Sequence, residues 1–377
     1  MVKRSLMIRL SALLVISAIL AVGLWGCSDS DVTGPVANDQ SDAVLKSAAN
    51  PNIRAVMAIQ NRHTPALMAD PDVIATATTV DESGQPAILL LVTSERARGG
   101  APKWLDDIRV ITEITDPIVA MKGKPGGGGG GGGGVDHKAL QNTPIQMGTS
   151  GGWRYDLANG YCCGGTLGSL IQVGGNKRIL SNYHVFEADI INGGNGQKAT
   201  TGDPIVHPAL IDIGCIAGNG IDVATLVVSS ALPGNNVDCS SANIINGQVD
   251  TSGAILEIGT ISSATVAAYV NQPVKKSGRT TGLGRAKVTG LNATVSITYE
   301  NECAGGTAFT KTFTGQIITS NKRSRFLAGG DSGSLMVEDV TTNPHAIGLL
   351  FAGSSRTAVA NPIDDVLSFY NATMVGN

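Results

Sequence analysis

The sequence is poor in charge and in aromatic side chains. Of its 377 residues only 15% are Asp, Glu, Lys or Arg, and only 4% are Phe, Trp or Tyr. The formal net charge is −3 and no block of like charges occurs, so we expect no nucleic-acid partner. Few aromatics together with 49 glycines favour a protein rich in strands and loops over a helical bundle.

Metal-binding patterns are also missing. The sequence has no CxxC spacing and no cluster of histidines, which argues against a zinc site, and we expect no metal and no cofactor. Six cysteines occur, at positions 27, 162, 163, 215, 239 and 303. In an oxidising compartment such cysteines can form lasting disulfides. Cys215 and Cys239 bracket a 23-residue segment and are predicted to pair, whereas Cys303 has Cys162 and Cys163 as alternative partners.

The first 26 residues have the pattern of a secretory signal. Three basic residues lie at positions 3, 4 and 9, and an apolar stretch follows at 10–24 that is too short for a stable membrane span. The stretch ends in Leu-Trp-Gly-Cys at 24–27, which resembles the lipobox of bacterial lipoproteins. That resemblance implies a lipid on Cys27 and attachment to the bacterial cell envelope, with Ser28 favouring the outer membrane. An ordinary cleaved signal, and thus a secreted protein, is the alternative.

Residues 27–50 are predicted to be a lipid-attached tether. A helical pattern follows at 53–68, with Pro65 interrupting it, and then strand-like runs at 73–79, 87–92 and 108–114. These elements predict a small α+β domain at 51–122 that is a pro-region, a regulator or an adapter. Nine glycines at 126–134 predict a linker at 123–135 that leaves this domain without a fixed orientation.

Residues 136–377 show short apolar runs separated by Gly, Asn and Ser, which predict an all-β barrel or sandwich. The runs lie at 166–173, 178–180, 221–228, 254–258, 287–295, 315–319, 334–337 and 346–351. A helical pattern returns only at 363–370.

The segment 329–334, Gly-Gly-Asp-Ser-Gly-Ser, is the strongest chemical signal in this region. A serine hydroxyl becomes a nucleophile only when a base removes its proton and donors stabilise the oxyanion. Glycines on both sides of Ser332 allow the backbone to turn inward, so the N–H groups of Gly330 and Ser332 are candidates for the oxyanion hole. A simple Gly/Ser turn between strands is the alternative.

His184 is the candidate base, because it directly follows the strand-like run that begins at Arg178. A lone histidine after a strand is more often structural, so a partner carboxylate is needed. Asp222 opens an apolar strand between the histidine and the serine, and a buried charge there needs a partner. Asp212 is the competing candidate.

Four segments resemble motifs of the trypsin-like serine peptidases, especially the secreted bacterial α-lytic and streptogrisin group. They are 180–185 (Leu-Ser-Asn-Tyr-His-Val), 221–224 (Ile-Asp-Val-Ala), 276–282 (Lys-Ser-Gly-Arg-Thr-Thr-Gly) and 330–334 (Gly-Asp-Ser-Gly-Ser). The resemblance covers about 143–370. It implies two six-stranded β-barrels and a serine peptidase domain at 136–377, with the triad His184, Asp222 and Ser332 in the cleft between the barrels.

The resemblance also implies that Asp331 pairs with a cation. No Ile-Val-Gly-Gly-like activation sequence follows a basic residue near the start of the barrel, so the expected partner is internal, Lys276 or Arg279. Phe351 occupies the position where the family usually has a serine that supports the triad aspartate, which puts that support in doubt.

Four residues are expected to bind substrate: Phe326, Phe351, Ala352 and Gly353. Phe326 lies six residues before Ser332, at the position of the pocket floor. No carboxylate is present there to bind Lys or Arg, so we expect a preference for apolar or small side chains.

These observations predict a monomeric serine endopeptidase that acts on proteins or peptides through an acyl-enzyme. Two alternatives remain open. The first is a surface lipoprotein whose peptidase fold has become a binding module. The second is a peptidase that mainly cleaves its own chain at or near the glycine linker.

Overall fold

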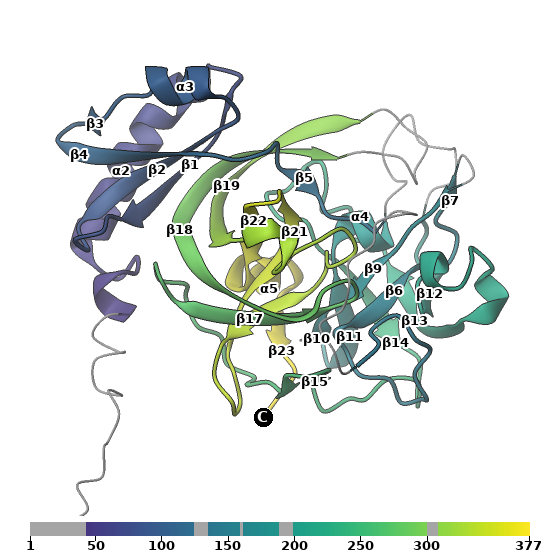
Figure 1. Cartoon of the computed structure of the whole chain (residues 1–377). Coiled ribbons are helices and arrows are strands. Elements are labelled where there is room, and N and C mark those ends of the chain that lie inside the picture. Colours follow the sequence, from purple (N-terminus) through teal and green to yellow (C-terminus); the bar gives the residue numbers. More distant parts are fainter. Residues whose placement is uncertain (1–42, 124–134, 159–160, 188–198, 300–307) are drawn as a thin grey trace, which may run out of the picture.

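The computed structural model describes residues 43–123, 135–158, 161–187, 199–299 and 308–377 (Figure 1). The predicted signal, Cys27, the nine glycines and Cys303 lie outside these ranges. Within the described ranges, no helix combines the length and the apolar character needed to cross a membrane.

The N-terminal unit is a small sheet covered by one long helix. Its elements are α2 (Pro51–Leu67), β1 (Val73–Val80), β2 (Pro86–Val92), α3 (Glu95–Gly100), β3 (Trp104–Leu105) and β4 (Ile108–Ile114). Asn50 caps α2, since its side chain accepts a hydrogen bond from the Asn52 N–H. The predicted α+β elements are confirmed. The helix runs through Pro65 and ends two residues later, so the expected interruption is confined to its last turn.

The first barrel uses six strands if β9 and β10 are counted as one strand broken at Gly168. Its strands are β6 (Thr149–Trp153), β9 (Gly165–Leu167), β10 (Ser169–Val173), β11 (Asn176–Ser181), β12 (Pro204–His207), β13 (Ile221–Val227) and β14 (Ser240–Ile244), with β23 (Ala372–Met374) added beside β10. β6 pairs with β9, and this pairing closes the barrel.

The second barrel is a closed ring of six strands in the order β17, β20, β21, β22, β19 and β18, with β18 pairing back to β17. The strands are β17 (Pro273–Gly278), β18 (Gly282–Tyr299), β19 (Phe309–Ser320), β20 (Leu335–Glu338), β21 (Ala346–Gly353) and β22 (Thr357–Pro362). The predicted helix is α5 (Ile363–Tyr370). The predicted mainly β, double-barrel fold is confirmed.

Short elements complete the chain. They are β5 (Val119–Ala120), β7 (Leu157–Ala158), β8 (Tyr161–Cys162), α4 (Tyr183–Phe186), β15 (Ala254–Ile255) and β16 (Gly259–Thr260), with single 3₁₀ turns at Leu210–Asp212, Ala217–Asn219 and Lys322–Ser324.

The N-terminal unit is joined to the second barrel through its sheet. β1 pairs antiparallel with β18 (Figure 1), so the strands of both parts form one continuous sheet. The buried Gln60 of α2 reinforces the junction by donating to the Asn292 carbonyl at 2.9 Å. The expectation that this unit has no fixed orientation is therefore wrong, because backbone pairing, and not the glycine linker, sets its position.

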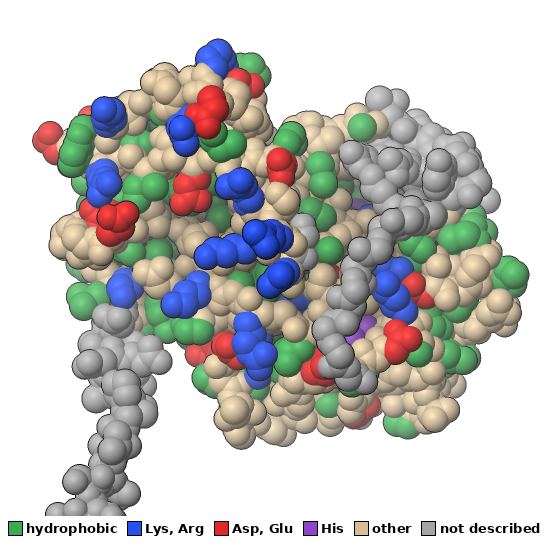
Figure 2. Space-filling view, in the orientation of Figure 1, with side chains coloured by type: hydrophobic (Ala, Val, Ile, Leu, Met, Phe, Trp, Pro, Cys, Tyr) green, Lys and Arg blue, Asp and Glu red, His purple; other side chains and the backbone are tan. Residues whose placement is uncertain are grey.

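Basic side chains also lie near the junction. Figure 2 shows Lys and Arg side chains grouped across the middle of one face, beside the N-terminal unit.

Candidate active site

His184 and Asp238 form a buried pair at one end of the first barrel. β11 pairs antiparallel with β14, with Ser181 opposite Ser240. The two strands run in opposite directions, so the residues that follow Ser181 lie near the residues that precede Ser240. His184 Nδ1 lies 2.6 Å from Asp238 Oδ2, and their side chains are 7% and 0% exposed. The carboxylate can therefore fix the orientation of the ring.

Asp238 is itself held by neighbouring side chains. The Tyr299 hydroxyl donates to Asp238 Oδ2 at 2.8 Å. Asn182 Nδ2 donates to the Asp238 carbonyl at 2.7 Å, and Asn361 Oδ1 accepts from the Asp238 N–H at 3.2 Å. Burial and the Asp238 charge raise the pKa of Tyr299 well above its usual range, so its phenol stays protonated as a donor. Position 351 is Phe and not the serine that supports the aspartate in the family. In this chain the Tyr299 hydroxyl gives the aspartate that support.

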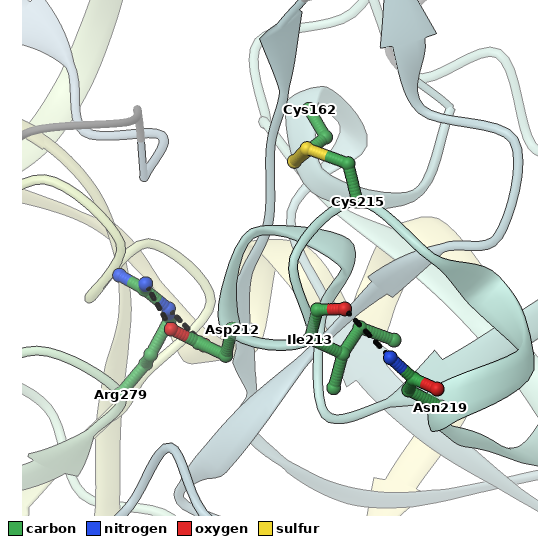
Figure 3. The surroundings of a disulfide bond; sticks show 6 residues. All are labelled: Cys162, Asp212, Ile213, Cys215, Asn219 and Arg279. Atoms are coloured by element: carbon green, nitrogen blue, oxygen red, sulfur yellow. Dashed lines mark hydrogen bonds and ion pairs between the residues drawn. A yellow bond between two sulfur atoms is a disulfide. The ribbon is translucent and has the colours of Figure 1, made fainter.

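The prediction that Asp222 orients His184 is wrong. Its carboxylate accepts from Arg154, and its side chain is 38% exposed. In the register of β12 and β13, Asp222 lies opposite Val206, away from α4. The alternative Asp212 pairs with Arg279, with Oδ1 and Nη2 2.5 Å apart (Figure 3). Asp238 is the carboxylate that contacts His184.

Ser332 lies in a tight turn before β20. Gly330 and Gly333 on either side have φ of 99° and 93°, a backbone region that favours glycine. A Cβ at Gly333 would lie 2.3 Å from Ser181 Oγ. The turn thus packs against the end of β11, three residues before His184.

The Ser332 hydroxyl donates to the Phe351 carbonyl at 3.1 Å. His184 Nε2 is buried and accepts no hydrogen bond within the described part of the chain. A rotation about the Ser332 Cα–Cβ bond would redirect the hydroxyl from Phe351, and such catalytic bonds often form only when substrate is bound.

Asp331 is buried against Lys276, as expected for an internal cation. Lys276 Nζ lies 3.2 Å from Asp331 Oδ1, and both side chains are fully buried. Burial raises the pKa of Asp331, but Lys276 and hydrogen bonds from Thr281 and two backbone N–H groups outweigh it, so the pKa lies below its ordinary value. The expectation of Lys276 is confirmed. Its alternative, Arg279, pairs with Asp212 instead.

The predicted disulfide between Cys215 and Cys239 is wrong. Cys215 is bonded to Cys162, with the two Cα atoms 5.6 Å apart (Figure 3). Cys239 is a buried free thiol that directly precedes β14 and packs in the hydrophobic core. Cys163 also takes part in a disulfide.

Three of the predicted substrate-binding residues belong to two different apolar clusters, Phe326 to one and Phe351 and Ala352 to the other. Phe326 is 2% exposed and belongs to a cluster with Leu327 and Leu350. The Phe351 ring packs against Phe313, with centroids 5.1 Å apart, so this residue presents its carbonyl and not its side chain. Ala352 and Gly353 pair through their backbone with β5.

Two residues of this site were missed in the sequence. Asp238 satisfies the same order rule as Asp222, since it also lies between the histidine and the serine, two residues before a strand. Tyr299 carries no sequence signal, because its contact depends on how far β18 extends.

No family model and no curated protein matches the sequence. Among solved structures, protease A of Thermobifida fusca is 19% identical, with a TM-score of 0.40 over 62% of this chain and 99% of that one. A chymotrypsin of Cellulomonas bogoriensis is 21% identical (TM-score 0.37; 56% and 91%). A glutamic-acid-specific serine protease is 18% identical (TM-score 0.39; 61% and 100%).

The two barrels that the resemblance implied are present in this chain. The catalytic roles are assigned from the geometry of this chain and not from these scores.

Proposed function

We propose that this protein is a serine endopeptidase with His184, Asp238 and Ser332 as its triad. The observation that carries the proposal is the buried contact between His184 Nδ1 and Asp238 Oδ2 at 2.6 Å, beside a glycine-flanked serine. A buried carboxylate on Nδ1 keeps the proton on that nitrogen, which leaves Nε2 free to act as a base.

The reaction follows from these roles. His184 Nε2 accepts the hydroxyl proton as Ser332 Oγ attacks the peptide carbonyl, and the proton then passes to the leaving amine. The N–H groups of Gly330 and Ser332 stabilise the oxyanion. Water then hydrolyses the acyl-enzyme by the same route. The Asp331–Lys276 pair supports the turn from within, because it neutralises a buried charge next to the nucleophile.

The substrates we propose are peptides with an apolar residue before the cleaved bond. Phe326 packs among apolar side chains such as Leu327 and Leu350, and an apolar pocket favours apolar substrate residues by the surface they bury. From residues 1–27 we further propose export and lipid attachment at Cys27, as the sequence pattern suggests.

Labelling with a fluorophosphonate tests this function, because the reagent adds only to an activated serine. We expect mass spectrometry to map the label to Ser332, and Ser332→Ala and His184→Ala to abolish it. His345→Ala is the matched control, since His345 forms a hydrogen bond with Glu338 at the far end of β20. Labelling that persists in Ser332→Ala would overturn the proposal.

A further inference from the structure

A segment of the chain itself crosses the proposed cleft. After β4, Thr115 Oγ1 lies 2.6 Å from Ser354 Oγ, and the chain then enters the space between β18 and β21. β5 pairs parallel with β18 and antiparallel with β21, with Ala120 opposite Ala352. The Met121 N–H donates to the Phe351 carbonyl at 3.0 Å. Residues 118–123 thus lie as an added strand along the edge that leads to Ser332.

The Met121 carbonyl occupies the proposed oxyanion site. The Gly330 N–H donates to Met121 O at 2.6 Å, and Gly330 is one of the two candidate oxyanion donors. The Met121 side chain packs against the cluster that contains Phe326. In acyl transfer, the carbonyl held by the oxyanion donors is the one that is attacked. Met121 therefore occupies the position of the residue before a cleaved bond.

Contacts also hold the chain on the other side of the Met121–Lys122 peptide bond. Lys122 Nζ lies 2.8 Å from Asp156 Oδ2, and the Asp156 side chain is 0% exposed. Burial raises the pKa of Asp156, whereas the Lys122 ammonium opposes this shift. The Gly123 N–H donates to the Gly164 carbonyl at 2.8 Å.

Position 123 is tight for any side chain. A Cβ there would lie 3.0 Å from both the Gly164 carbonyl oxygen and Arg279 Nη1. The segment therefore fits the cleft on both sides of the Met121–Lys122 bond.

We infer that residues 118–123 are bound as an internal substrate and that Ser332 cleaves the Met121–Lys122 bond of its own chain. This inference rests on the proposed function and names its first substrate. Ser332 Oγ attacks the Met121 carbonyl carbon while His184 accepts the hydroxyl proton. The C–N bond then breaks, and His184 returns the proton to the Lys122 nitrogen. One water molecule hydrolyses the ester, which frees the Met121 carboxylate and the Ser332 hydroxyl.

Until that bond is cut and the segment leaves, the cleft is closed to other peptides. β1 remains paired with β18 after the cut, so the N-terminal unit keeps its new carboxyl end near the cleft. External substrates are those that match the segment, with an apolar residue before the bond and Lys-Gly after it.

Purified full-length protein tests the inference by intact mass and N-terminal sequencing. We expect a fragment beginning at Lys122, formed at a first-order rate that does not depend on protein concentration. Ser332→Ala should slow the cut by about 10⁴-fold or more, and mixing with the wild type should not restore it. Met121→Asp should slow it about 100-fold, because a carboxylate does not fit an apolar pocket, whereas Met121→Leu should cleave within about tenfold of the wild type.

The fluorophosphonate separates this inference from the proposed function. The charged side chain in Met121→Asp weakens the hold of the segment on the cleft, so Ser332 in this variant should be labelled although its chain is uncut. A wild type whose Ser332 is labelled but whose chain stays intact, or is cut only at another bond, overturns self-cleavage and leaves the peptidase function standing. If the wild type and Met121→Asp show neither cleavage nor label, both proposals are wrong.

Discussion

Replacing Asp238 by Asn tests the assignment of the triad with minimal change in volume. Asp238 Oδ2 accepts from both His184 Nδ1 and the Tyr299 hydroxyl, and Oδ1 faces the His184 backbone N–H at 3.4 Å. If the amide nitrogen replaces Oδ1, two N–H donors face each other. If it replaces Oδ2, it donates to Nδ1 and forces the ring proton onto Nε2. In that tautomer His184 cannot accept the proton of Ser332.

The size of the effect follows from this tautomer. In a triad the same substitution lowers kcat by about 10⁴-fold, which corresponds to about 5 kcal/mol of transition-state stabilisation. Asp222→Asn is the matched control, because it weakens only a partly exposed pair with Arg154. Such pairs are worth about 1 kcal/mol or less in stability, and activity should stay within about twofold.

The assay is hydrolysis of a peptide that contains Ala-Met-Lys-Gly, with kcat and KM measured separately and thermal unfolding as the check of folding. We expect Asp238→Asn to lower kcat with little change in KM or unfolding temperature. Loss of activity in Asp222→Asn together with full activity in Asp238→Asn would refute this assignment and make Asp222 the triad aspartate.

Three further outcomes are expected. Tyr299→Phe removes a hydrogen bond to a buried carboxylate, worth about 1.5–3 kcal/mol, and should lower kcat about 10- to 100-fold at constant KM; a changed KM with constant kcat would contradict a positioning role. Because the folded-state pKa of Asp331 lies below its ordinary value of 3.8, its contribution to stability is complete above that pH and lost as the pH falls through the folded value. Asp331→Asn should therefore flatten the acid limb of the unfolding free energy and cost about 3–5 kcal/mol at pH 7, as measured by denaturant titration. Cys27→Ser should release the protein from membranes, because the acyl chains hold it there; continued tight association in membrane fractionation would rule out the lipid anchor.

Local patterns in the sequence predicted much of the fold and part of the site. The runs that became β1, β2, β4 and β13 were located to within about two residues, because alternating apolar residues and turn residues act over short distances. His184 and Ser332 were also recognisable, since each depends on its immediate neighbours. Lys276 was one of two expected partners for Asp331, and the structure decided between them.

The partner of His184 was not predictable in the same way. Asp222 and Asp238 both lie at or just before the start of a strand after the histidine, and only the pairing of β11 with β14 brings Asp238 beside it. The same holds for the disulfide, where the partner of Cys215 lies 53 residues earlier in the chain. Strand register is set by long-range packing, so no short window of sequence contains it.

By itself, then, the sequence located part of the strands, the segments that carry the proposed nucleophile and its base, and a glycine run between two parts. Only the tertiary structure decided which carboxylate meets His184 and that β1 extends the sheet of the second barrel. It also decided that Met121 enters the proposed active site. The physical reason is that backbone N–H and C=O groups make the contacts of β1 with β18 and of residues 118–123 with the cleft. Every residue type except proline carries both groups, so the side-chain pattern does not show where they pair.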